Sequence, residues 1–245
     1  MTVFTYDDSK RAGACRDFLL SSGRMDKYKM LTILPIPTTR DGVHLTGSGV
    51  TLASLCLEAE PGEIYLGYGI PAFLSDSLSS AGAVVVDASL DGEFLLENAR
   101  LTALATLAYI LSRGDVSADN LSVGVVGYGR IGRELVRLLL SVGARVRVFS
   151  TRRETVLCLS SSGVDATLVT GGDPIPSVDI LVNTAPAKIF DENSPVRPDM
   201  DILELASGNF FGEARVTRLP SLPSRYYPVT AGRLYGAALL RALGV

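Results

Sequence analysis

Three glycines at fixed spacing are the strongest chemical signal in the chain. The segment Gly127-Tyr128-Gly129-Arg130-Ile131-Gly132 has the spacing of a dinucleotide fingerprint. In such a loop the first glycine permits a tight turn, the second lets the backbone approach a pyrophosphate, and the third lets helix and strand pack closely. The helix N-terminus then offers free N–H groups to the phosphates. The segment predicts a dinucleotide site; the alternative is a tight turn that binds nothing.

The residues that follow the next predicted strand, Arg145–Phe149, help to distinguish NAD from NADP as the cofactor. An NAD site usually carries Asp or Glu there, whereas this chain reads Ser150-Thr151-Arg152-Arg153. Arginine suits a 2′-phosphate because its planar fork forms charge-assisted, often bidentate bonds. We therefore predict NADP, with NAD as the second choice. A structural alternative stays open, because Thr151 and Glu154 have the spacing of a capping box, which would leave the arginines as a solvated face.

Two later strand ends carry small and hydroxylic residues. They are Asn183-Thr184-Ala185-Pro186 and Ala206-Ser207. Ligands of open parallel sheets lie beyond the carboxyl ends of the strands, so we predict that both segments contact the cofactor. Ordinary turn chemistry is the alternative, since such residues form turns in any loop.

The apolar patterns around these segments predict an α/β protein with two domains. Residues 1–95 form a small, shortened α/β domain, 96–114 a linking helix, 115–228 a Rossmann domain with a doubly wound parallel sheet, and 229–245 a C-terminal helix that packs back on the first domain. Strands are expected at Thr2–Tyr6, Met30–Ile36, Glu63–Gly67, Ala83–Asp87, Leu121–Gly127, Arg145–Phe149, Ala166–Val169, Asp179–Asn183 and Asp201–Leu205. Helices are expected at Ser9–Ser22, from near Pro71, and at Leu90–Arg113, Arg130–Val142 and Thr230–Leu243.

Composition narrows the function classes. The chain has 245 residues, 47% of them hydrophobic, and a net charge of −3, which is typical of a soluble globular protein. No basic run favours nucleic acid, and the longest stretch without a charged residue, Gly42–Leu57, is too short and polar to span a membrane. Three scattered cysteines predict neither a metal site nor disulfides. We expect a cytoplasmic homo-oligomer without a signal peptide.

Four stretches in this order resemble the A subunit of bacterial dipicolinate synthase. They are Val125–Gly132, Val182–Pro186, Ile202–Ser207 and Thr230–Gly232, with Leu34–Thr39, Asn98 and Thr102 in the expected order. The resemblance covers most of the chain from Met30 onward. It implies NADP-linked oxidation of a dihydrodipicolinate-type intermediate to dipicolinate during sporulation. It also implies a partner, a flavoprotein-like B subunit.

A dicarboxylate substrate of this kind needs cationic or hydroxyl groups. The candidates for substrate binding are Thr38, Thr39, Arg40, Asn98, Arg100, Thr102 and Arg233. The family tends to carry a Glu-Gly pair after the threonine of the linking helix, whereas here Thr102 is followed by Ala103-Leu104-Ala105.

His44 is the chain's one histidine and the one candidate general base. It lies in the first-domain loop Pro37–Gly49, so it does not fit the His–carboxylate scheme of D-2-hydroxyacid dehydrogenases. An exposed loop histidine without a role is the favoured alternative. Two other functions stay open: a shikimate-dehydrogenase-like reductase and a non-catalytic nucleotide-binding regulator.

Overall fold

The structure is a computed structural model that describes residues 1–25, 28–113, 116–170, 173, 177–187, 189–190, 200–206 and 216–245. Contacts along the chain divide it into two units. Unit 1 comprises Met1–Asn98 and Pro223–Val245, and unit 2 comprises Ala99–Leu222. The two units are described separately below.

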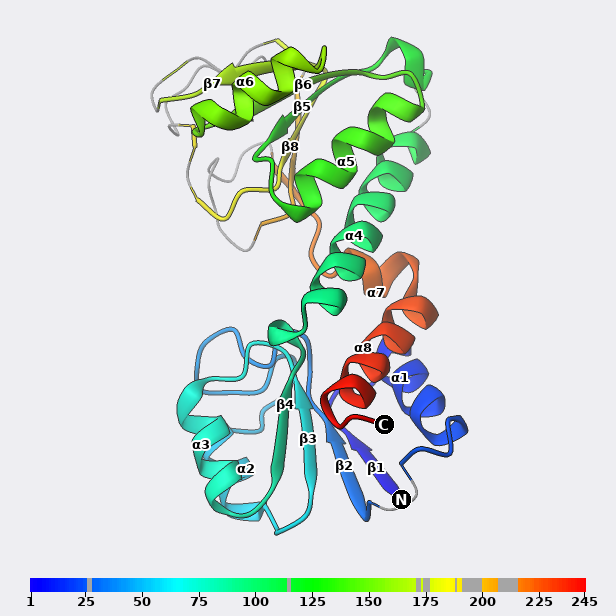
Figure 1. The fold of residues 1–245 in the computed structure, drawn as a ribbon, viewed down its shortest axis with the longest axis vertical. Coiled ribbons are helices and arrows are strands. Elements are labelled where there is room, and N and C mark those ends of the chain that lie inside the picture. The colour runs from blue at the N-terminus through cyan, green and yellow to red at the C-terminus, as the bar shows by residue number, and fades with distance from the viewer. Residues whose placement is uncertain are drawn as a thin grey trace. The chain divides into compact units, whose positions relative to one another are not determined.

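Unit 1 is built on a four-stranded parallel sheet (Figure 1). Its strands lie in the order β1 (Thr2–Thr5), β2 (Met30–Ile33), β3 (Ile64–Gly67) and β4 (Val84–Asp87). The connecting helices are α1 (Lys10–Ser21), α2 (Leu52–Glu58) and α3 (Ala72–Ser80), and the C-terminal segment adds α7 (Leu222–Tyr226) and α8 (Pro228–Ala242).

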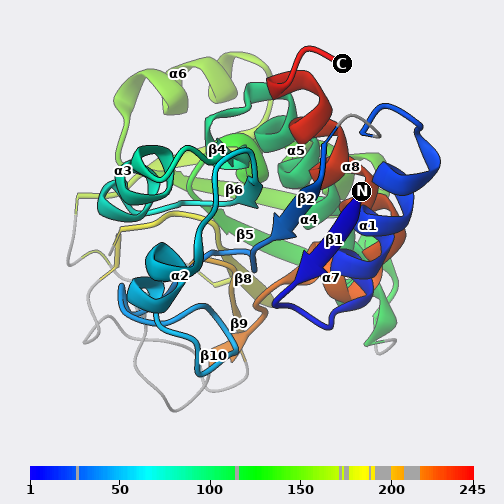
Figure 2. The same cartoon turned by 90° about the horizontal axis from the view of Figure 1, so that it is seen from below.

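The helices of unit 1 cover both faces of its sheet (Figure 2). Leu31, Ile33 and Leu66 pack with α1 and α8 on one face, whereas Tyr65 packs with α2 and α3 on the other. The β1–α1–β2 and β3–α3–β4 connections both lead to the next strand in the same direction along the sheet. Because α1 and α3 lie on opposite faces, the two crossovers have opposite hands. Nearly all such crossovers are right-handed, so one of these two has the rare left hand.

Two glycines of α8 allow it to approach α1 closely. A Cβ on Gly232 would meet the Arg11 carbonyl oxygen, and it would lie 2.7 Å from Ala14 Cβ. A Cβ on Gly236 would lie 2.7 Å from the Phe18 ring. Between these glycines, Tyr235 is buried and donates its hydroxyl to the carbonyl oxygens that end β2 and β3 (Tyr235 Oη to Leu34 O, 3.3 Å, and to Leu66 O, 3.2 Å). The last helix therefore completes the core of unit 1.

Unit 2 is built on a six-stranded parallel sheet in the order β10-β9-β8-β5-β6-β7. The strands are β5 (Ser122–Val126), β6 (Arg145–Ser150), β7 (Asp165–Leu168), β8 (Ile180–Asn183), β9 (Asp201–Glu204) and β10 (Val216–Arg218). The order reverses beside β5, as in a doubly wound Rossmann sheet. Helices α5 (Arg130–Ser141) and α6 (Arg153–Ser161) pack against β5, β6 and β7. The predicted fold class is therefore correct.

The helix α4 (Gly92–Ser112) contains the division between the two units. The short 3-10 helix Ala88–Leu90 precedes it, and a second one, Ala118–Asn120, precedes β5. Asp91 caps α4 by accepting the Phe94 N–H at 2.9 Å. By length and composition alone α4 could cross a membrane, but the buried core helix of a soluble protein satisfies the same criteria, so this is weak support for a membrane span.

Several predicted boundaries were wrong, each for a local reason. The strand expected over Met30–Ile36 ends at Ile33, because Pro35 cannot donate to a ladder and Ile36–Pro37 is cis. The long helix begins at Gly92 rather than Leu90, because Asp91 is its cap. Four helices and strands went unpredicted: α2, α6, α7 and β10, which have seven, nine, five and three residues. Elements this short do not show a clear hydrophobic period.

Candidate functional site

The turn between β5 and α5 has the backbone that the fingerprint requires. Gly127 has φ +88°, and its N–H donates to Phe149 O at 2.9 Å. A Cβ on Gly132 would meet the Gly127 carbonyl oxygen and lie 3.1 Å from Gly127 C. A Cβ on Gly129 would have nothing within 4 Å. The first and third glycines are therefore required by the fold, whereas the second leaves open space in front of the helix.

The N-terminus of α5 is free to receive an anion. Gly129 is the N-cap residue, and it has no side chain to bond the first-turn N–H groups. No acidic residue lies in the first turn, where Arg130 is exposed and Ile131 half-buried. One turn on, the Arg133 guanidinium lies over the Tyr128 ring, 5.4 Å from its centroid, and holds that ring in place. The glycine turn thus fits the pyrophosphate of a dinucleotide.

The carboxyl end of β6 presents two cations. Ser150 is buried, and its Oγ accepts the Arg152 N–H at 3.1 Å. Thr151, Arg152 and Arg153 are exposed, and within the described part of the chain neither guanidinium makes a hydrogen bond or an ion pair. The N-cap of α6 is Arg152, not Thr151, and it makes no side-chain cap bond. The capping-box alternative is therefore wrong.

The carboxyl ends of β8 and β9 are joined by a buried polar pair. Asn183 and Glu204 face each other in the β8–β9 register, with exposed fractions of 1% and 3%. Asn183 Nδ2 donates to both carboxylate oxygens of Glu204 at 2.9 Å. Each side chain also accepts a backbone N–H from the loop that follows its strand: Asn183 Oδ1 from Ala185 at 3.1 Å, and Glu204 Oε1 from Ala206 at 2.9 Å. The pair therefore fixes both loops.

The Asn183 side chain thus forms its hydrogen bonds with other groups of the protein. The surface at the carboxyl ends of β8 and β9 is formed by the residues that follow Asn183 and Glu204. Thr184 Oγ1 donates to Val126 O at 2.9 Å and lies beside the fingerprint turn. Ala185 is buried, Pro186 exposed and Ala206 half-buried, whereas Ser207 lies outside the described residues. Glu204 was not among the predicted site residues, although it stands in one of the quoted stretches. Burial raises its pKa, and the hydrogen bonds from Asn183 and Ala206 oppose that rise.

In unit 1, four predicted residues lie in the loop after β2. Thr38 is fully buried, and its Oγ1 accepts the Tyr68 N–H at 2.9 Å. Thr39 Oγ1 donates to Asp41 at 3.2 Å, and Arg40 is exposed. His44 Nδ1 lies 2.8 Å from Asp41 Oδ2. Backbone and side-chain bonds from His44 hold the pKa of Asp41 well below its usual range. His44 is therefore paired with a carboxylate, in an exposed loop.

The remaining predicted substrate residues lie on helices. Asn98 and Thr102 are on α4, half-buried and buried respectively, and each has a partner. Arg100 lies 3.8 Å from Glu134 of α5. Arg233 is exposed on α8.

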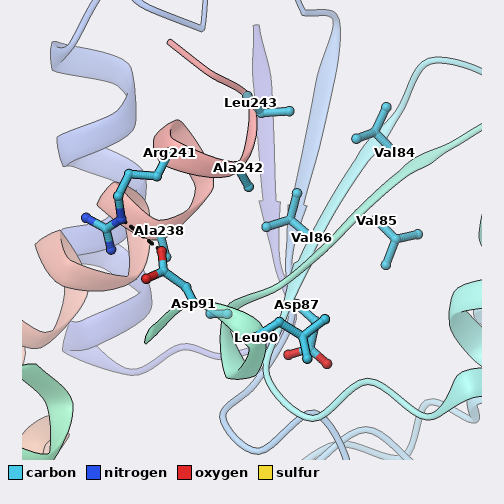
Figure 3. A pocket seen from close by; sticks show the side chains of 11 residues that line it. Val84, Val85, Val86, Asp87, Leu90, Asp91, Ala238, Arg241, Ala242 and Leu243 are labelled. Carbon is cyan, nitrogen blue, oxygen red and sulfur yellow. Dashed lines mark hydrogen bonds and ion pairs between the residues drawn. The ribbon is translucent and has the colours of Figure 1, made fainter. Parts of the chain in front are cut away.

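Other potentially reactive groups contribute little. Burial raises the pKa of the Cys15 thiol to about 12, so it stays protonated. Among the described residues no cluster of His, Cys, Asp or Glu could hold a metal ion. A pocket of about 530 Å³ lies in unit 1 beside the edge strand β4 and the end of α8 (Figure 3). Its walls are mainly apolar, and its ion pair, Arg241 with Asp91 at 2.9 Å, is internally satisfied.

A parallel sheet whose order reverses beside a glycine turn places unit 2 in the class of proteins with a doubly wound Rossmann fold. Comparison with solved structures agrees. The structure is similar to that of the A subunit of dipicolinate synthase from Bacillus halodurans, with TM-score 0.75, 18% identity, and coverage of 99% of this chain and 97% of that chain. The corresponding protein from Bacillus subtilis gives TM-score 0.73, 19% identity, and coverage of 99% and 94%.

A transhydrogenase from Sinorhizobium meliloti is also similar, with TM-score 0.63, 15% identity, and coverage of 99% and 92%. At such identities these matches show the fold. They confirm, at the level of the fold, the resemblance to the A subunit of dipicolinate synthase. No protein-family model matches the sequence, and neither does any curated protein.

Proposed function

We propose that the chain is a nicotinamide-dependent oxidoreductase whose cofactor binds at the glycine turn of unit 2. One observation carries the proposal: the first turn of α5 is free of side-chain caps and acidic residues and opens onto space left by Gly129. A diphosphate there would receive backbone N–H groups and the positive end of the helix dipole. When bound, the cofactor supplies the hydride chemistry, and the protein supplies binding and orientation.

The cofactor we propose is NADP. Arg152 and Arg153 stand at the end of β6, where an NAD site usually has a carboxylate, and their guanidinium groups are unpaired among the described residues. A 2′-phosphate would pair with them through charge-assisted hydrogen bonds. The loops after β8 and β9, held by Asn183 and Glu204, would support the nicotinamide half.

For the substrate we propose a pyridine dicarboxylate precursor, oxidised to dipicolinate. The sequence resemblance and the similarity to two solved structures of dipicolinate synthase support this choice. A partner of the flavoprotein-like B type and a role in sporulation follow from the same resemblance. Formation of an aromatic ring is favourable in itself, so the protein needs mainly to position the substrate and accept a proton. The pair of His44 with Asp41 is the candidate for that acceptor, because a carboxylate at Nδ1 orients the imidazole and leaves Nε2 free.

Thermal unfolding with NADPH, with NADH and without cofactor tests the cofactor proposal. A ligand at about a hundred times its dissociation constant adds ~2.7 kcal/mol, which raises the unfolding temperature of a protein of this size by ~5–10 °C. We expect this rise with NADPH and a smaller one with NADH. No rise with either cofactor would contradict the proposal.

Substitution of both arginines tests the choice between the two cofactors. We expect Arg152→Ala with Arg153→Ala to weaken NADPH binding by ~100-fold and to leave NADH binding unchanged, since charge-assisted hydrogen bonds contribute ~1.5–3 kcal/mol each. Arg137→Ala is a matched control, because Arg137 is already paired with Glu134 at 2.6 Å. Equal loss of NADPH and NADH binding would refute the phosphate contact.

Turnover separates the enzyme from its competitors. Addition of a dihydrodipicolinate precursor and NADP⁺, together with the B subunit, should produce dipicolinate and NADPH, because NADP⁺ accepts the hydride, and absorbance measures the NADPH formed. We expect His44→Asn to lower kcat by ~100-fold if it accepts the proton. Cofactor binding without turnover would favour a regulatory relative, and reduction of a dehydroshikimate-type substrate would favour the shikimate-dehydrogenase-like alternative.

A further inference from the structure

Unit 1 contains a buried arginine without a partner among the described residues. Arg11 is 6% exposed, yet within that part of the chain its guanidinium makes no hydrogen bond or ion pair. Buried charges are normally paired, because the desolvation of an isolated charge is costly. The buried carboxylates follow that rule: Glu204 is held by Asn183, and Glu63 accepts the Tyr65 hydroxyl at 2.8 Å. Arg11 has no such bond to its guanidinium within the described part of the chain.

Arg11 lies at the edge of the sheet where ligands of open α/β folds bind. It belongs to the first turn of α1, directly after the carboxyl end of β1. Burial lowers the pKa of Arg11, and the charges of Tyr235 and Asp7 oppose that fall. The Tyr235 hydroxyl itself bonds the carbonyl oxygens of Leu34 and Leu66, which lie at the carboxyl ends of β2 and β3.

The packing of α8 fixes the position of Arg11. Because Gly232 has no side chain, α8 lies directly on the Arg11 carbonyl oxygen and on the Cys15 N–H, which is 2.8 Å from where a Cβ would be. The backbone that carries the guanidinium is therefore held by both helices. Because the side chain is also buried, it has few alternative positions, and a guanidinium held in this way suits the recognition of a planar anion.

The polar groups described around Arg11 bond to one another and not to its guanidinium. Ser9 caps α1 by accepting the Ala12 N–H at 3.2 Å, and the first turn holds no acidic residue. The nearest carboxylate, Asp7, bonds Ser9 and not Arg11: its two oxygens accept the Ser9 N–H and the Ser9 hydroxyl, both at 2.8 Å. The remaining ionisable neighbours, Cys15 and Tyr235, have raised pKa values because they are buried, and they stay neutral.

We infer that Arg11, with the N-terminus of α1, binds a carboxylate group of the substrate. The identity of that acid rests on the proposed function, whereas the anion site itself rests on the unpaired guanidinium. A carboxylate matches the guanidinium fork with two parallel hydrogen bonds, and the helix dipole favours its charge. A substrate with two carboxylates would use this site for one of them.

Thermal unfolding and ligand titration of Arg11→Met test this inference with dipicolinate as the probe. Wild type should unfold ~5 °C higher with saturating dipicolinate, and Arg11→Met should lose that shift. Without ligand, Arg11→Met should unfold at the wild-type temperature or above it, because an unpaired buried charge is removed. Arg11→Lys, which keeps the charge and loses the fork, should bind at least tenfold more weakly. The control is Arg16→Met, because Arg16 lies on α1 but is exposed and paired with Asp17 at 3.1 Å.

Two results would overturn the inference: a dipicolinate shift in Arg11→Met equal to that of wild type, or a fall of several degrees in its unliganded unfolding temperature. The NADPH shift, measured on the same samples, separates this inference from the proposed function. An NADPH shift in wild type without any dipicolinate shift refutes the Arg11 site alone. A dipicolinate shift that needs Arg11, without an NADPH shift, supports the site and refutes the cofactor proposal.

Discussion

Units 1 and 2 share one arrangement of strands and helices but differ in the residues that line the carboxyl ends of their strands. Both present the carboxyl ends of parallel strands, followed by the first turn of a helix. In unit 2 that edge is lined by glycine backbone, and its buried carboxyl group, Glu204, accepts hydrogen bonds from Asn183 and Ala206 within the protein. In unit 1 the buried charge at the edge is Arg11, which has no partner in the described part of the chain.

We expect the two edges to differ in how selectively they bind a ligand. A backbone-lined turn can bind any dinucleotide, because N–H groups and a helix dipole recognise phosphate rather than a base. A single buried guanidinium recognises an acid, and its position depends on two packed helices. The generic site therefore has a sequence fingerprint, and the specific one does not.

The largest expected effect is that of a methyl group at the third fingerprint glycine. Gly132→Ala would place Cβ against the Gly127 carbonyl oxygen, and we expect a loss of ~3 kcal/mol of folding stability together with NADPH binding. Gly129→Ala is the matched control, since its Cβ meets nothing within 4 Å. It should keep the unfolding temperature and lose cofactor affinity. Urea unfolding and NADPH titration measure both, and unchanged NADPH affinity in Gly129→Ala would remove that glycine from the site.

The corresponding change in unit 1 should affect a different property. Gly232→Ala places Cβ against the Arg11 carbonyl oxygen and 2.8 Å from Cys15 N, so we expect ~2 kcal/mol of destabilisation from displaced helices. NADPH affinity should stay within about twofold of wild type, whereas dipicolinate affinity should fall at least tenfold because Arg11 moves. Ala237→Gly, at a half-buried position of the same helix, controls for helix propensity. Equal loss of both ligands would show that the two sites are not independent.

A smaller effect, with a defined sign, is expected for the buried carboxylate of unit 2. Glu204→Gln replaces one acceptor by an amide donor that faces the Asn183 amide, and we expect a loss of ~1–2 kcal/mol. Because burial raises the pKa of Glu204 in the folded protein, wild type takes up a proton on folding near and above 4.5. The stability advantage of wild type over the variant should therefore be largest below pH 4.5 and shrink as the pH rises.

The control for this pH dependence is Glu134→Gln, which should have the opposite sign. The hydrogen bond from Arg137 lowers the pKa of Glu134, so its contribution is present above 4.5 and is lost as the pH falls. Urea unfolding at about pH 4 and about pH 7 distinguishes the two. A Glu204→Gln penalty that grows toward high pH would contradict the assigned direction.

The sequence could predict those features that depend on local spacing. The glycine turn, the strand that precedes it and the helix that follows lie within one short segment, so the role of each glycine can be predicted from the sequence. The Asn183–Glu204 pair was not predicted, because it depends on β8 lying beside β9 in one particular register. Arg11 was missed for a similar reason: on its own helix it looks like any surface arginine, and its burial depends on tertiary packing such as that of α8, from the other end of the chain.

Unit 1 is built from two segments that are far apart in the sequence, so its core can be completed only after the second segment, Pro223–Val245, has been synthesised. Tyr235 bonds the carbonyl oxygens of Leu34 and Leu66, which precede it by 201 and 169 residues, and α8 closes the core that α1 opens. Unit 2 is encoded without interruption and can form while translation continues. In unit 1, the part of the apolar sheet face that α8 covers stays exposed until residues 223–245 leave the ribosome. Exposed apolar surface of this kind makes the first half of unit 1 prone to aggregation while the chain is being synthesised.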